Sequence, residues 1–189
     1  AALIDPAQRM FLMTAWSALE DACLSAKKID GTDTGVYVGY TSPTENYSEI
    51  LAQSDPEYAD RAIPGKVNSI IASRLSYWLN LKGPAVMVDT ACSSSLAAVH
   101  AACSAIHQGD CKQAIVGSVK INLMPLVSSG ENSVSVISTD GSTRTFDVKA
   151  NGTNPGEGVA ALVLKPLNEA EKDKDRIYAV IKGSALNQD

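Results

Sequence analysis

The sequence predicts an α/β fold built on a largely parallel sheet. Short runs rich in Val and Ile alternate along the chain with stretches in which apolar residues recur at helical spacing. Strands that alternate with helices favour a parallel sheet, because each helix carries the chain back to the edge where the preceding strand began. The 189 residues are 45% hydrophobic and 20% charged and contain no internal repeat, a composition typical of a globular domain with a sizeable core.

The first predicted helix begins after Asp5. Asp5 can cap the helix, Pro6 suits its first position, and Gln8 stands three residues after the cap, where it can close a capping box. The apolar stripe of this helix consists of Leu12, Ala15, Trp16, Leu19, Ala22 and Cys23. A strand at residues 35–40 follows, with glycines that mark turns or a close backbone approach, and residues 41–66 are polar and irregular.

A second helix, capped by Asn68, is predicted to end at Asn80, before a turn at residues 82–84. Its apolar stripe consists of Ile71, Ala72, Leu75 and Trp78 or Leu79. A β-rich run at residues 85–90 then leads without a linker, through the segment Ala91-Cys92-Ser93-Ser94-Ser95, into a helix at residues 96–107. This third helix is predicted to present a face of Leu96, Val99, Cys103 and Ile106 and to end at Gly109.

The remaining chain is predicted to form three further strands. They lie at residues 113–122, 158–167 and 177–183. A loop-rich stretch covers residues 128–151, and a charged turn covers residues 169–175.

Charge and cysteine content exclude several classes of protein. Sixteen Lys and Arg against 21 Asp and Glu give a net charge of −5, and no basic block is present that could bind nucleic acid. No apolar run approaches the roughly 20 residues of a membrane span and no signal peptide opens the chain, so we expect a cytoplasmic protein. The four cysteines show no CxxC pair or finger spacing, which predicts free thiols and no metal site.

Cys92 stands where a buried strand is predicted to turn into a helix. The helix dipole and the unpaired first-turn N–H groups favour a thiolate at such a place, and they can stabilise an oxyanion when a thioester carbonyl is attacked. Position alone leaves two interpretations, a small buried residue or a nucleophile. His100 lies about 12 Å along the same helix and His107 lies farther, so neither can serve Cys92 as a base.

The residues around Cys92 closely resemble the active-site segment of β-ketoacyl synthase (ketosynthase) domains of modular polyketide synthases. The resemblance rests on Asp89-Thr90-Ala91-Cys92-Ser93-Ser94-Ser95-Leu96-Ala97-Ala98-Val99-His100 and continues along the whole chain. Upstream it includes Asp5-Pro6-Ala7-Gln8-Arg9, Ala18-Leu19-Glu20-Asp21, Asn68-Ser69-Ile70, Arg74-Leu75-Ser76-Tyr77 and Leu81-Lys82-Gly83-Pro84. Downstream it includes Asp140-Gly141, Arg144-Thr145-Phe146-Asp147, Gly156-Glu157-Gly158 and Gly183-Ser184-Ala185-Leu186-Asn187-Gln188-Asp189.

This resemblance implies a thiolase-like fold of two related α/β halves, a homodimer, and Cys92 as the catalytic nucleophile. Cys92 would accept an acyl chain from an acyl carrier protein, and decarboxylative Claisen condensation with a malonyl-type extender would follow. The phosphopantetheine arm would arrive on the partner carrier protein, so no cofactor is expected to bind here directly. The partners implied are the carrier protein and other polyketide synthase domains, in a pathway such as antibiotic biosynthesis.

The same resemblance implies that residues 1–189 are one incomplete ketosynthase domain. They would comprise most of the N-terminal half and, from about residue 176, the first strand of the second half. The family's two catalytic histidines come later than Asp189, and its first strand comes before Asp5. Without that strand, the strands at residues 36–39 and 113–122 would lack a shared neighbour. We therefore expect a segment of a longer synthase, or a piece that folds only beside the remainder.

Other residues bear on specificity or have ordinary structural interpretations. The residues Glu131, Ser135 and Val136 depart from the family pattern in a region that often borders the acyl channel, and residues 138–147 and 152–167 look most like synthases whose acyltransferase acts in trans. Glu157 is either a buried carboxylate near the site or a turn residue, and Arg144 with Asp147 is either a loop-ordering pair or a surface pair. Trp16 and Trp78 are expected in the core or at an interface.

Three functional hypotheses follow. The first is an elongating ketosynthase that uses Cys92. The second is a non-elongating ketosynthase that only holds or relays the acyl chain, and the third is a non-catalytic dimerisation fragment. A general thiolase fits less well, because residues 140–147 and 183–189 resemble the polyketide branch.

Overall fold

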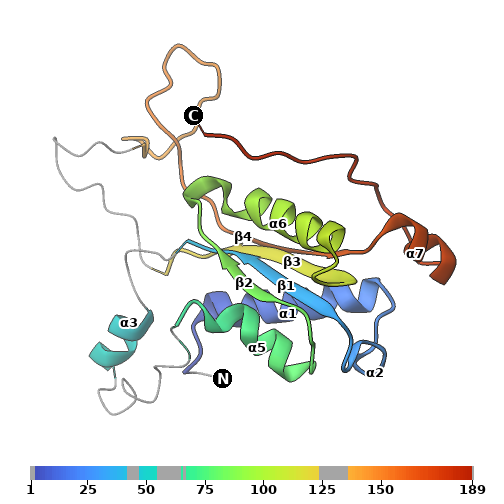
Figure 1. Ribbon diagram of the computed structural model, residues 1–189. Coiled ribbons are helices and arrows are strands. Elements are labelled where there is room, and N and C mark those ends of the chain that lie inside the picture. The colour runs from blue at the N-terminus through green and yellow to red at the C-terminus, as the bar shows by residue number, and fades with distance from the viewer. Residues whose placement is uncertain (1–2, 42–46, 55–64, 66, 124–135, 189) are drawn as a thin grey trace.

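The protein folds around one four-stranded sheet. The computed structural model describes residues 3–41, 47–54, 65, 67–123 and 136–188 (Figure 1). The strands are β1 (Thr34–Gly39), β2 (Ala85–Val88), β3 (Gln113–Lys120) and β4 (Gly158–Leu164), in the order β2-β1-β3-β4. β1 pairs in parallel with β2 and β3, while β4 pairs antiparallel with β3. The predicted α/β fold with a largely parallel sheet is confirmed.

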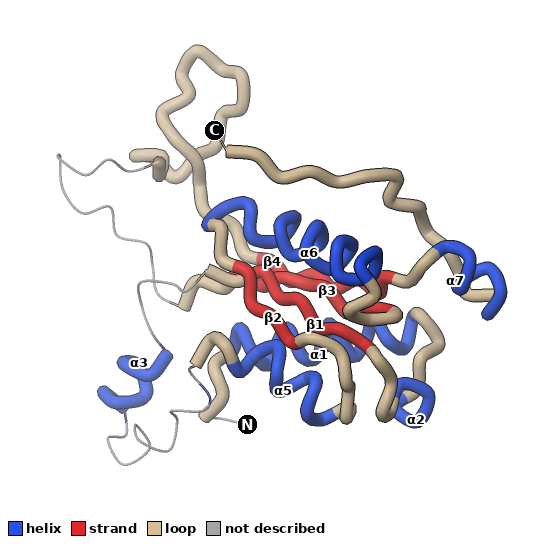
Figure 2. The backbone as a smooth tube through the Cα atoms, in the orientation of Figure 1, coloured by secondary structure: helices blue, strands red, loops and turns tan. Residues whose placement is uncertain are grey.

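Helices cover both faces of this sheet. Helices α1 (Pro6–Asp21) and α5 (Ile70–Trp78) lie on one face, and α6 (Ser94–Gln108) lies on the other (Figure 2). Successive residues of β1 point to opposite faces, as a strand requires. Val36 and Val38 therefore join the core under α1 and α5, whereas Tyr37 joins the core under α6.

The start of α1 is only partly as predicted. The Asp5 carboxylate accepts a hydrogen bond from the Ala7 N–H at 2.7 Å, and Pro6 occupies the first turn. Gln8 does not close a capping box. Its amide is buried and donates to the Val67 carbonyl at 3.3 Å, which attaches α1 to the chain segment before α5.

The start of α5 also differs from the prediction. The helix begins at Ile70, with Ser69 and not Asn68 at the cap position. The N–H groups of Ile70 and Ile71 donate to the carbonyls of Val67 and Asn68, so Asn68 lies in a tight turn that leads into the helix. The described chain also contains two short helices that were not predicted, α2 (Ala26–Ile29) and α3 (Tyr47–Ser54).

The sheet has no gap between β1 and β3. The sequence predicted that these strands would lack a shared neighbour, but they pair directly over six residue pairs, from Thr34–Gln113 to Gly39–Ser118. Both strands are apolar on their two faces, so direct pairing satisfies their backbone groups and keeps both cores closed.

The buried face of α6 is not the predicted one. Leu96 is 74% exposed, and Val99, Cys103 and Ile106 are only partly buried. The helix lies close to the sheet, so only small side chains fit between them. These side chains include Ala97, Ala98, Ala102 and Ala105. The two tryptophans are not core residues either, since Trp16 is 43% and Trp78 is 57% exposed.

The chain after β4 departs most from the prediction. The expected charged turn at residues 169–175 is a helix, α7 (Leu167–Asp173), which ends where Lys174 adopts a left-handed conformation with φ 59°. Residues 176–188 run extended but are not assigned to a strand, in contrast to the strand predicted at residues 177–183. Side chains hold this segment in place of backbone pairing. The Tyr178 hydroxyl donates to Asp21 at 2.9 Å, and Ser184 lies 2.9 Å from His100 Nδ1. No helix in the described ranges is long and apolar enough to cross a membrane.

Candidate active site

Cys92 lies in the tight connection between β2 and α6, where the sequence predicted it, but β2 is a partly exposed edge strand and not the buried strand expected. A single 3-10 turn, η2 (Ala91–Ser93), joins the strand to the helix, and the Cys92 side chain is exposed. Ala91, directly before it, has a left-handed backbone with φ 54°. This conformation costs a residue with a Cβ about 1–2 kcal/mol, so the surrounding contacts must hold it.

Three side chains within the connection bind its backbone, and one of them is Ser93, whose hydroxyl donates to the Thr90 carbonyl at 2.8 Å. The buried Ser94 hydroxyl donates to the Ala91 carbonyl at 2.7 Å and accepts from the Thr90 N–H at 2.9 Å. The Asp89 carboxylate accepts from the Ala91 N–H at 3.1 Å. Both polar groups of the strained Ala91 are therefore hydrogen-bonded.

Thr41, which follows β1, also contacts this connection. Its hydroxyl donates to the Asp89 carboxylate at 2.8 Å and lies 3.3 Å from both the Ala91 carbonyl and the Ser94 hydroxyl. The hydrogen bond from Thr41, followed by that from the Ala91 N–H, lowers the pKa of Asp89 below its ordinary value. Asp89 is therefore an anion at neutral pH. Thr41 and Asp89 were not predicted as functional residues from the sequence, because 48 positions separate them.

Gly39 allows β1 and α6 to meet beside this connection. A Cβ on Gly39 would lie 2.5 Å from the Ser94 carbonyl oxygen, a backbone atom that cannot move independently. The close backbone approach that the sequence predicted for the glycines of this strand is confirmed at Gly39. The contact fixes the first turn of α6 against the end of β1.

The first turn of α6 is a potential binding site for negative charge. Ser93 occupies the cap position, and its side chain makes no capping hydrogen bond. The N–H groups of Ser93 and Ser94 donate to the carbonyls of Thr90 and Ala91 within the 3-10 turn. Cys92 is thus exposed at the positive end of the α6 dipole, where an anion or a developing oxyanion is favoured.

The two histidines of the chain lie elsewhere on α6. His100 Nδ1 is 2.9 Å from the Ser184 hydroxyl of the extended C-terminal segment, and His107 occupies the last turn of the helix. Neither is hydrogen-bonded to the Cys92 connection in the part of the chain that the structure describes. Cys92 therefore has no histidine partner among the described residues.

The loop at residues 136–156 is organised by residues that the sequence only partly predicted. Arg144 pairs with Asp140 at 2.8 Å and not with Asp147, and this hydrogen-bonded contact holds the pKa of the Asp140 carboxyl well below its usual range. The buried Ser138 hydroxyl lies 2.7 Å from both Asp140 and Asn151, a role the sequence did not reveal. The predicted pair of Arg144 with Asp147 is therefore wrong, and the Arg144–Asp140 pair that replaces it lies at the surface, with both side chains partly exposed.

Glu157 and Val136 both lie at the surface, in the loop between β3 and β4. Glu157 is exposed and accepts a hydrogen bond from the Asn122 N–H at 2.6 Å, so it joins the end of β3 to the start of β4 and is not a buried carboxylate. Val136 is exposed. Glu131 and Ser135 lie outside the described residues.

The other three cysteines differ from Cys92 in environment. Cys23 is exposed, Cys103 is partly buried and Cys111 is fully buried. Burial raises the pKa of both the Cys103 and the Cys111 thiols. All four are free thiols, and the described residues contain no group of three potential metal ligands.

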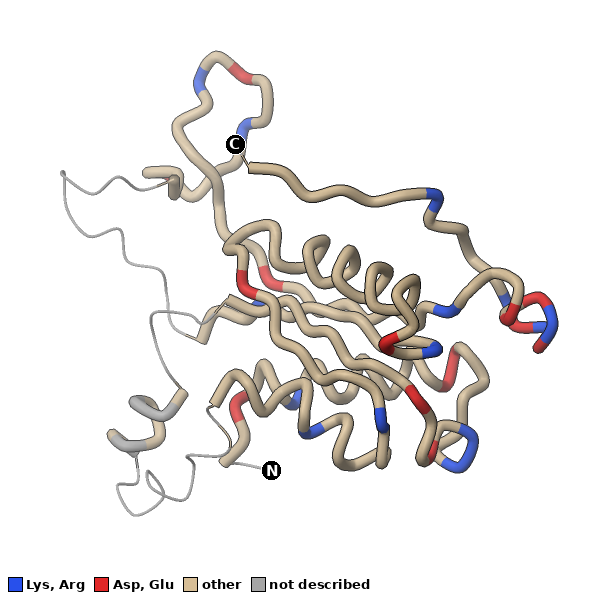
Figure 3. The backbone as a smooth tube through the Cα atoms, viewed as in Figure 1, with Lys and Arg blue, Asp and Glu red and all other residues tan. Residues whose placement is uncertain are grey.

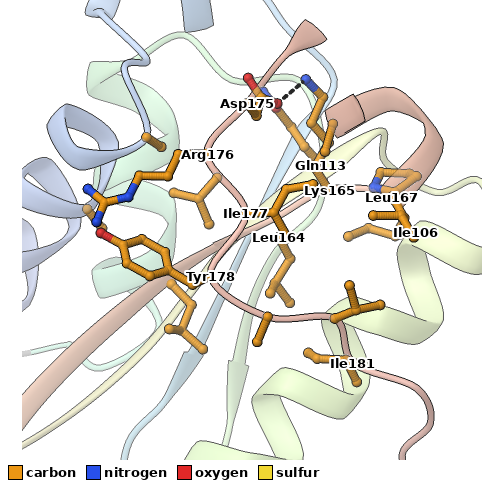
Figure 4. A pocket seen from close by; sticks show the side chains of 18 of the residues that line it. Ile106, Gln113, Leu164, Lys165, Leu167, Asp175, Arg176, Ile177, Tyr178 and Ile181 are labelled. Carbon is orange, nitrogen blue, oxygen red and sulfur yellow. Dashed lines mark hydrogen bonds and ion pairs between the residues drawn. The ribbon is translucent and has the colours of Figure 1, made fainter. Parts of the chain in front are cut away.

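A groove of about 510 Å³ lies apart from Cys92, between the extended C-terminal segment and the body of the fold (Figure 4). Its lining comes from α1, α6, β4 and residues 175–181 and includes Ile106, Leu164, Ile177 and Ile181. None of residues 89–95 lines it. The groove is therefore separate from the connection that carries Cys92.

Comparison with known proteins gives a consistent result. Residues 1–170 match the beta-ketoacyl synthase N-terminal domain. Polyketide synthase PksM of Bacillus subtilis is 41% identical over 98% of this chain, which spans 4% of that protein. Highly reducing polyketide synthase 40 of Fusarium pseudograminearum is 45% identical over 98% of this chain and 7% of its own length.

Solved structures of ketosynthases are similar to this chain in both sequence and fold. The ketosynthase from module 6 of the bacillaene synthase of Bacillus subtilis is 39% identical, with a TM-score of 0.74 over 93% of this chain and 29% of that one. Ketosynthase twelve of the bacillaene synthase of Bacillus amyloliquefaciens is 30% identical, with a TM-score of 0.80 over 94% of this chain and 31% of that one. The chain spans under a third of these solved chains and less than a tenth of the two synthases. The thiolase-like fold is thereby confirmed, and the chain belongs to the β-ketoacyl synthase family, whose N-terminal domain it matches.

Proposed function

We propose that this chain carries the acyl-accepting nucleophile of a polyketide condensing enzyme, and that the nucleophile is Cys92. The observation that carries the proposal is the exposed thiol at the strand-to-helix connection, beside the N-terminal turn of α6. Family membership over residues 1–170 supports the same assignment.

The reaction begins with attack of the Cys92 thiolate on a carrier-bound thioester. The sulfur forms a bond to the carbonyl carbon, and the carbonyl oxygen becomes an oxyanion that N–H donors can stabilise. Collapse of this tetrahedral intermediate expels the phosphopantetheine thiolate and leaves the acyl group on Cys92. The phosphopantetheine is part of the carrier protein substrate, and no resident cofactor is needed for this step.

Chain extension completes the cycle. A malonyl-type extender on a carrier protein loses carbon dioxide, and the resulting carbanion attacks the acyl-Cys92 carbonyl. A carbon–carbon bond forms, and the Cys92 thiolate leaves. This half of the reaction requires histidines other than His100 and His107, because neither reaches Cys92.

The proposed partners follow from this reaction. They are an acyl carrier protein, further polyketide synthase domains and a second copy of the same protein, in the cytoplasm. The relatives are polyketide synthases many times longer than this chain, which supports the first two partners. The resemblance to synthases whose acyltransferase acts in trans makes a separate acyltransferase a further proposed partner.

Intact mass spectrometry of the full-length protein that contains these residues tests the proposal. After exposure to an acyl thioester, we expect one acyl adduct in the wild type and none in Cys92→Ala. Cys103→Ala is the matched control, because Cys103 is a partly buried thiol on the adjoining helix, and it should be acylated as the wild type is.

Other outcomes would contradict the proposal in distinct ways. An adduct that persists in Cys92→Ala would place the nucleophile elsewhere. Cys92 no more reactive than Cys103 would indicate a non-catalytic dimerisation fragment. Acylation without a carbon–carbon bond in the presence of malonyl carrier protein would indicate a ketosynthase that only holds or relays the chain.

A further inference from the structure

Thr41 and Asp89 form a hydrogen-bonded pair that ties the Cys92 connection to the end of the neighbouring strand. Thr41 follows β1, and Asp89 follows β2, so the pair crosses between two parallel strands where both end. The backbone reinforces this junction, since the Tyr40 N–H donates to the Val88 carbonyl at 3.1 Å. The connection is therefore anchored to the sheet immediately before Cys92.

The contacts of this pair converge on one residue. The Ala91 carbonyl accepts from Ser94 at 2.7 Å and lies 3.3 Å from the Thr41 hydroxyl, while the Ala91 N–H donates to Asp89 at 3.1 Å. The Ala91 carbonyl and the Cys92 N–H belong to the same planar peptide unit and point in opposite directions. The Ser94 hydroxyl and the Ser94 N–H both donate to this carbonyl, so the Cys92 N–H points away from Ser94, and this sets the direction in which Cys92 leaves the turn.

The left-handed backbone of Ala91 requires contacts that hold it in place. A left-handed alanine relaxes to an ordinary conformation unless its neighbours oppose the change. Ser94 is buried against Gly39 and holds the Ala91 carbonyl from the first turn of α6. Asp89 lies two residues before Ala91, so its carboxylate could rotate with the turn. Thr41, which follows β1, donates to that carboxylate at 2.8 Å and so fixes the group that binds the Ala91 N–H.

We propose that Thr41 and Asp89 are positioning residues for Cys92, which hold the Ala91–Cys92 peptide in the orientation that productive attack on a bound thioester requires. The inference rests on the proposed function of Cys92. Thr41 is exposed and takes no part in either core, so its hydroxyl is not needed for packing. Its loss should affect directed attack more than folding.

The test measures acylation of Cys92 in a single turnover of the full-length protein, at saturating carrier-bound acyl thioester. We expect Thr41→Val, which keeps the shape and removes the hydroxyl, to slow acylation about tenfold, since small misplacements of reacting groups cost factors of this order or more. Thr41→Ser restores the hydroxyl and should remain within about twofold of the wild type.

Thr32→Val is the matched control. The Thr32 hydroxyl donates to the Ile29 carbonyl at 2.6 Å near the opposite end of β1, so this variant also loses a threonine hydrogen bond but far along the strand from Cys92. It should be acylated at the wild-type rate. Iodoacetamide, which approaches the thiol without a fixed direction, should alkylate Cys92 at rates within about twofold in all of these proteins.

A double variant tests whether the pair acts as one unit. If Thr41 acts through Asp89, then Thr41→Val combined with Asp89→Ala should be no more than about twofold slower than Asp89→Ala alone. The inference would be overturned if the fold-loss in the acylation rate of the double variant equalled the product of the fold-losses of the two single variants. Wild-type acylation in Thr41→Val, or failure of Thr41→Ser to restore the rate, would overturn it too. Parallel loss of acylation and alkylation would show a structural role and would also overturn it.

These failures are distinguishable from failure of the proposed function. If wild-type Cys92 takes no acyl group, the function assigned to Cys92 is wrong and the positioning role falls with it. If wild-type Cys92 is acylated and Thr41→Val is acylated equally fast, only the positioning role is wrong.

Discussion

The four cysteine side chains have different access to solvent, and this predicts an order of reactivity. Alkylation requires the thiolate and an open path to the sulfur. Cys23 and Cys92 are exposed, whereas burial raises the pKa of Cys103 and, in the interior, of Cys111. At pH 8 we expect iodoacetamide to label Cys23 and Cys92 first, Cys103 later and Cys111 only on unfolding. Peptide mass spectrometry over time measures the order, and early labelling of Cys111 would contradict its placement.

A second residue-level prediction concerns Gly39. Its missing Cβ leaves room for the Ser94 backbone, so Gly39→Ala must displace α6 from the end of β1. We expect a loss of about 1–3 kcal/mol in the free energy of unfolding, measured in urea. Gly156→Ala is the control, because no atom lies within 4 Å of its added Cβ, and it should change stability by less than about 0.5 kcal/mol. Equal effects in the two variants would contradict the close contact at Gly39.

At the level of elements, α6 shows what the sequence could and could not predict. Its position after Cys92 follows from the run of β-rich residues that passes directly into helical spacing, and this was predicted. Its buried face was not, because α6 carries no Lys, Arg, Asp or Glu, as Figure 3 shows, and the usual contrast between charged and apolar faces is missing. The more hydrophobic stripe consists of Leu96, Val99, Cys103 and Ile106. The buried face is instead made of alanines, because larger side chains do not fit where the helix lies close to the sheet.

This packing of α6 leads to a testable contrast between its two sides. Ala98 and Ala102 are completely buried, so Ala102→Leu should overpack the interface with the sheet and cost about 1–3 kcal/mol in the free energy of unfolding. Leu96→Ala removes a side chain that is mostly exposed and should cost less than about 0.5 kcal/mol. Urea unfolding of both variants measures the contrast. The opposite ranking would mean that the stripe predicted from the sequence is the buried one.

The elements after β4 were less predictable for a different reason. The turn predicted at residues 169–175 contains many charges, which fit a solvated helix as well as a turn, and Lys165 forms ion pairs with two of them, Asp173 and Asp175, around α7. The continuous apolar run at residues 177–181 is typical of a strand, but a strand needs a neighbouring backbone. In this structure the segment contacts side chains of α1 and α6.

Across the whole molecule, the order of the four strands and of helices α1, α5 and α6 was predictable, as was the place of Cys92 between a strand and a helix, whereas the pairing at the centre of the sheet was not. The motif around Cys92 depends on adjacent residues, so the sequence contains it directly. Pairing of β1 with β3 depends on residues far apart in the chain, such as Thr34 and Gln113, whose relation no local pattern records. The Thr41–Asp89 contact was missed for the same reason.

The two layers of core, one on each face of the sheet, should respond together to alkaline pH. Tyr37 belongs to the core under α6 and Tyr40 to the core under α1 and α5, and burial raises the pKa of each to about 12. In the unfolded chain a tyrosine ionises near pH 10. Their contribution to stability is therefore complete below pH 10 and is lost as the pH rises toward 12, by up to about 1.4 kcal/mol per pH unit for each tyrosine.

Thermal unfolding of the wild type, Tyr37→Phe and Tyr40→Phe between pH 9 and 12 tests this coupling. We expect each phenylalanine variant to lose less stability over this range than the wild type does, because one ionising group is absent. The absorbance at 295 nm that each buried phenol contributes is the difference between the wild type and its phenylalanine variant, because exposed tyrosines such as Tyr77 also absorb. This difference should rise in the same pH interval in which the protein unfolds, since the buried phenols ionise once the sheet and its helices separate. If Tyr37 ionises near pH 10 while Tyr40 stays protonated, the α6 layer opens independently, and the sheet does not join the two cores into one cooperative unit.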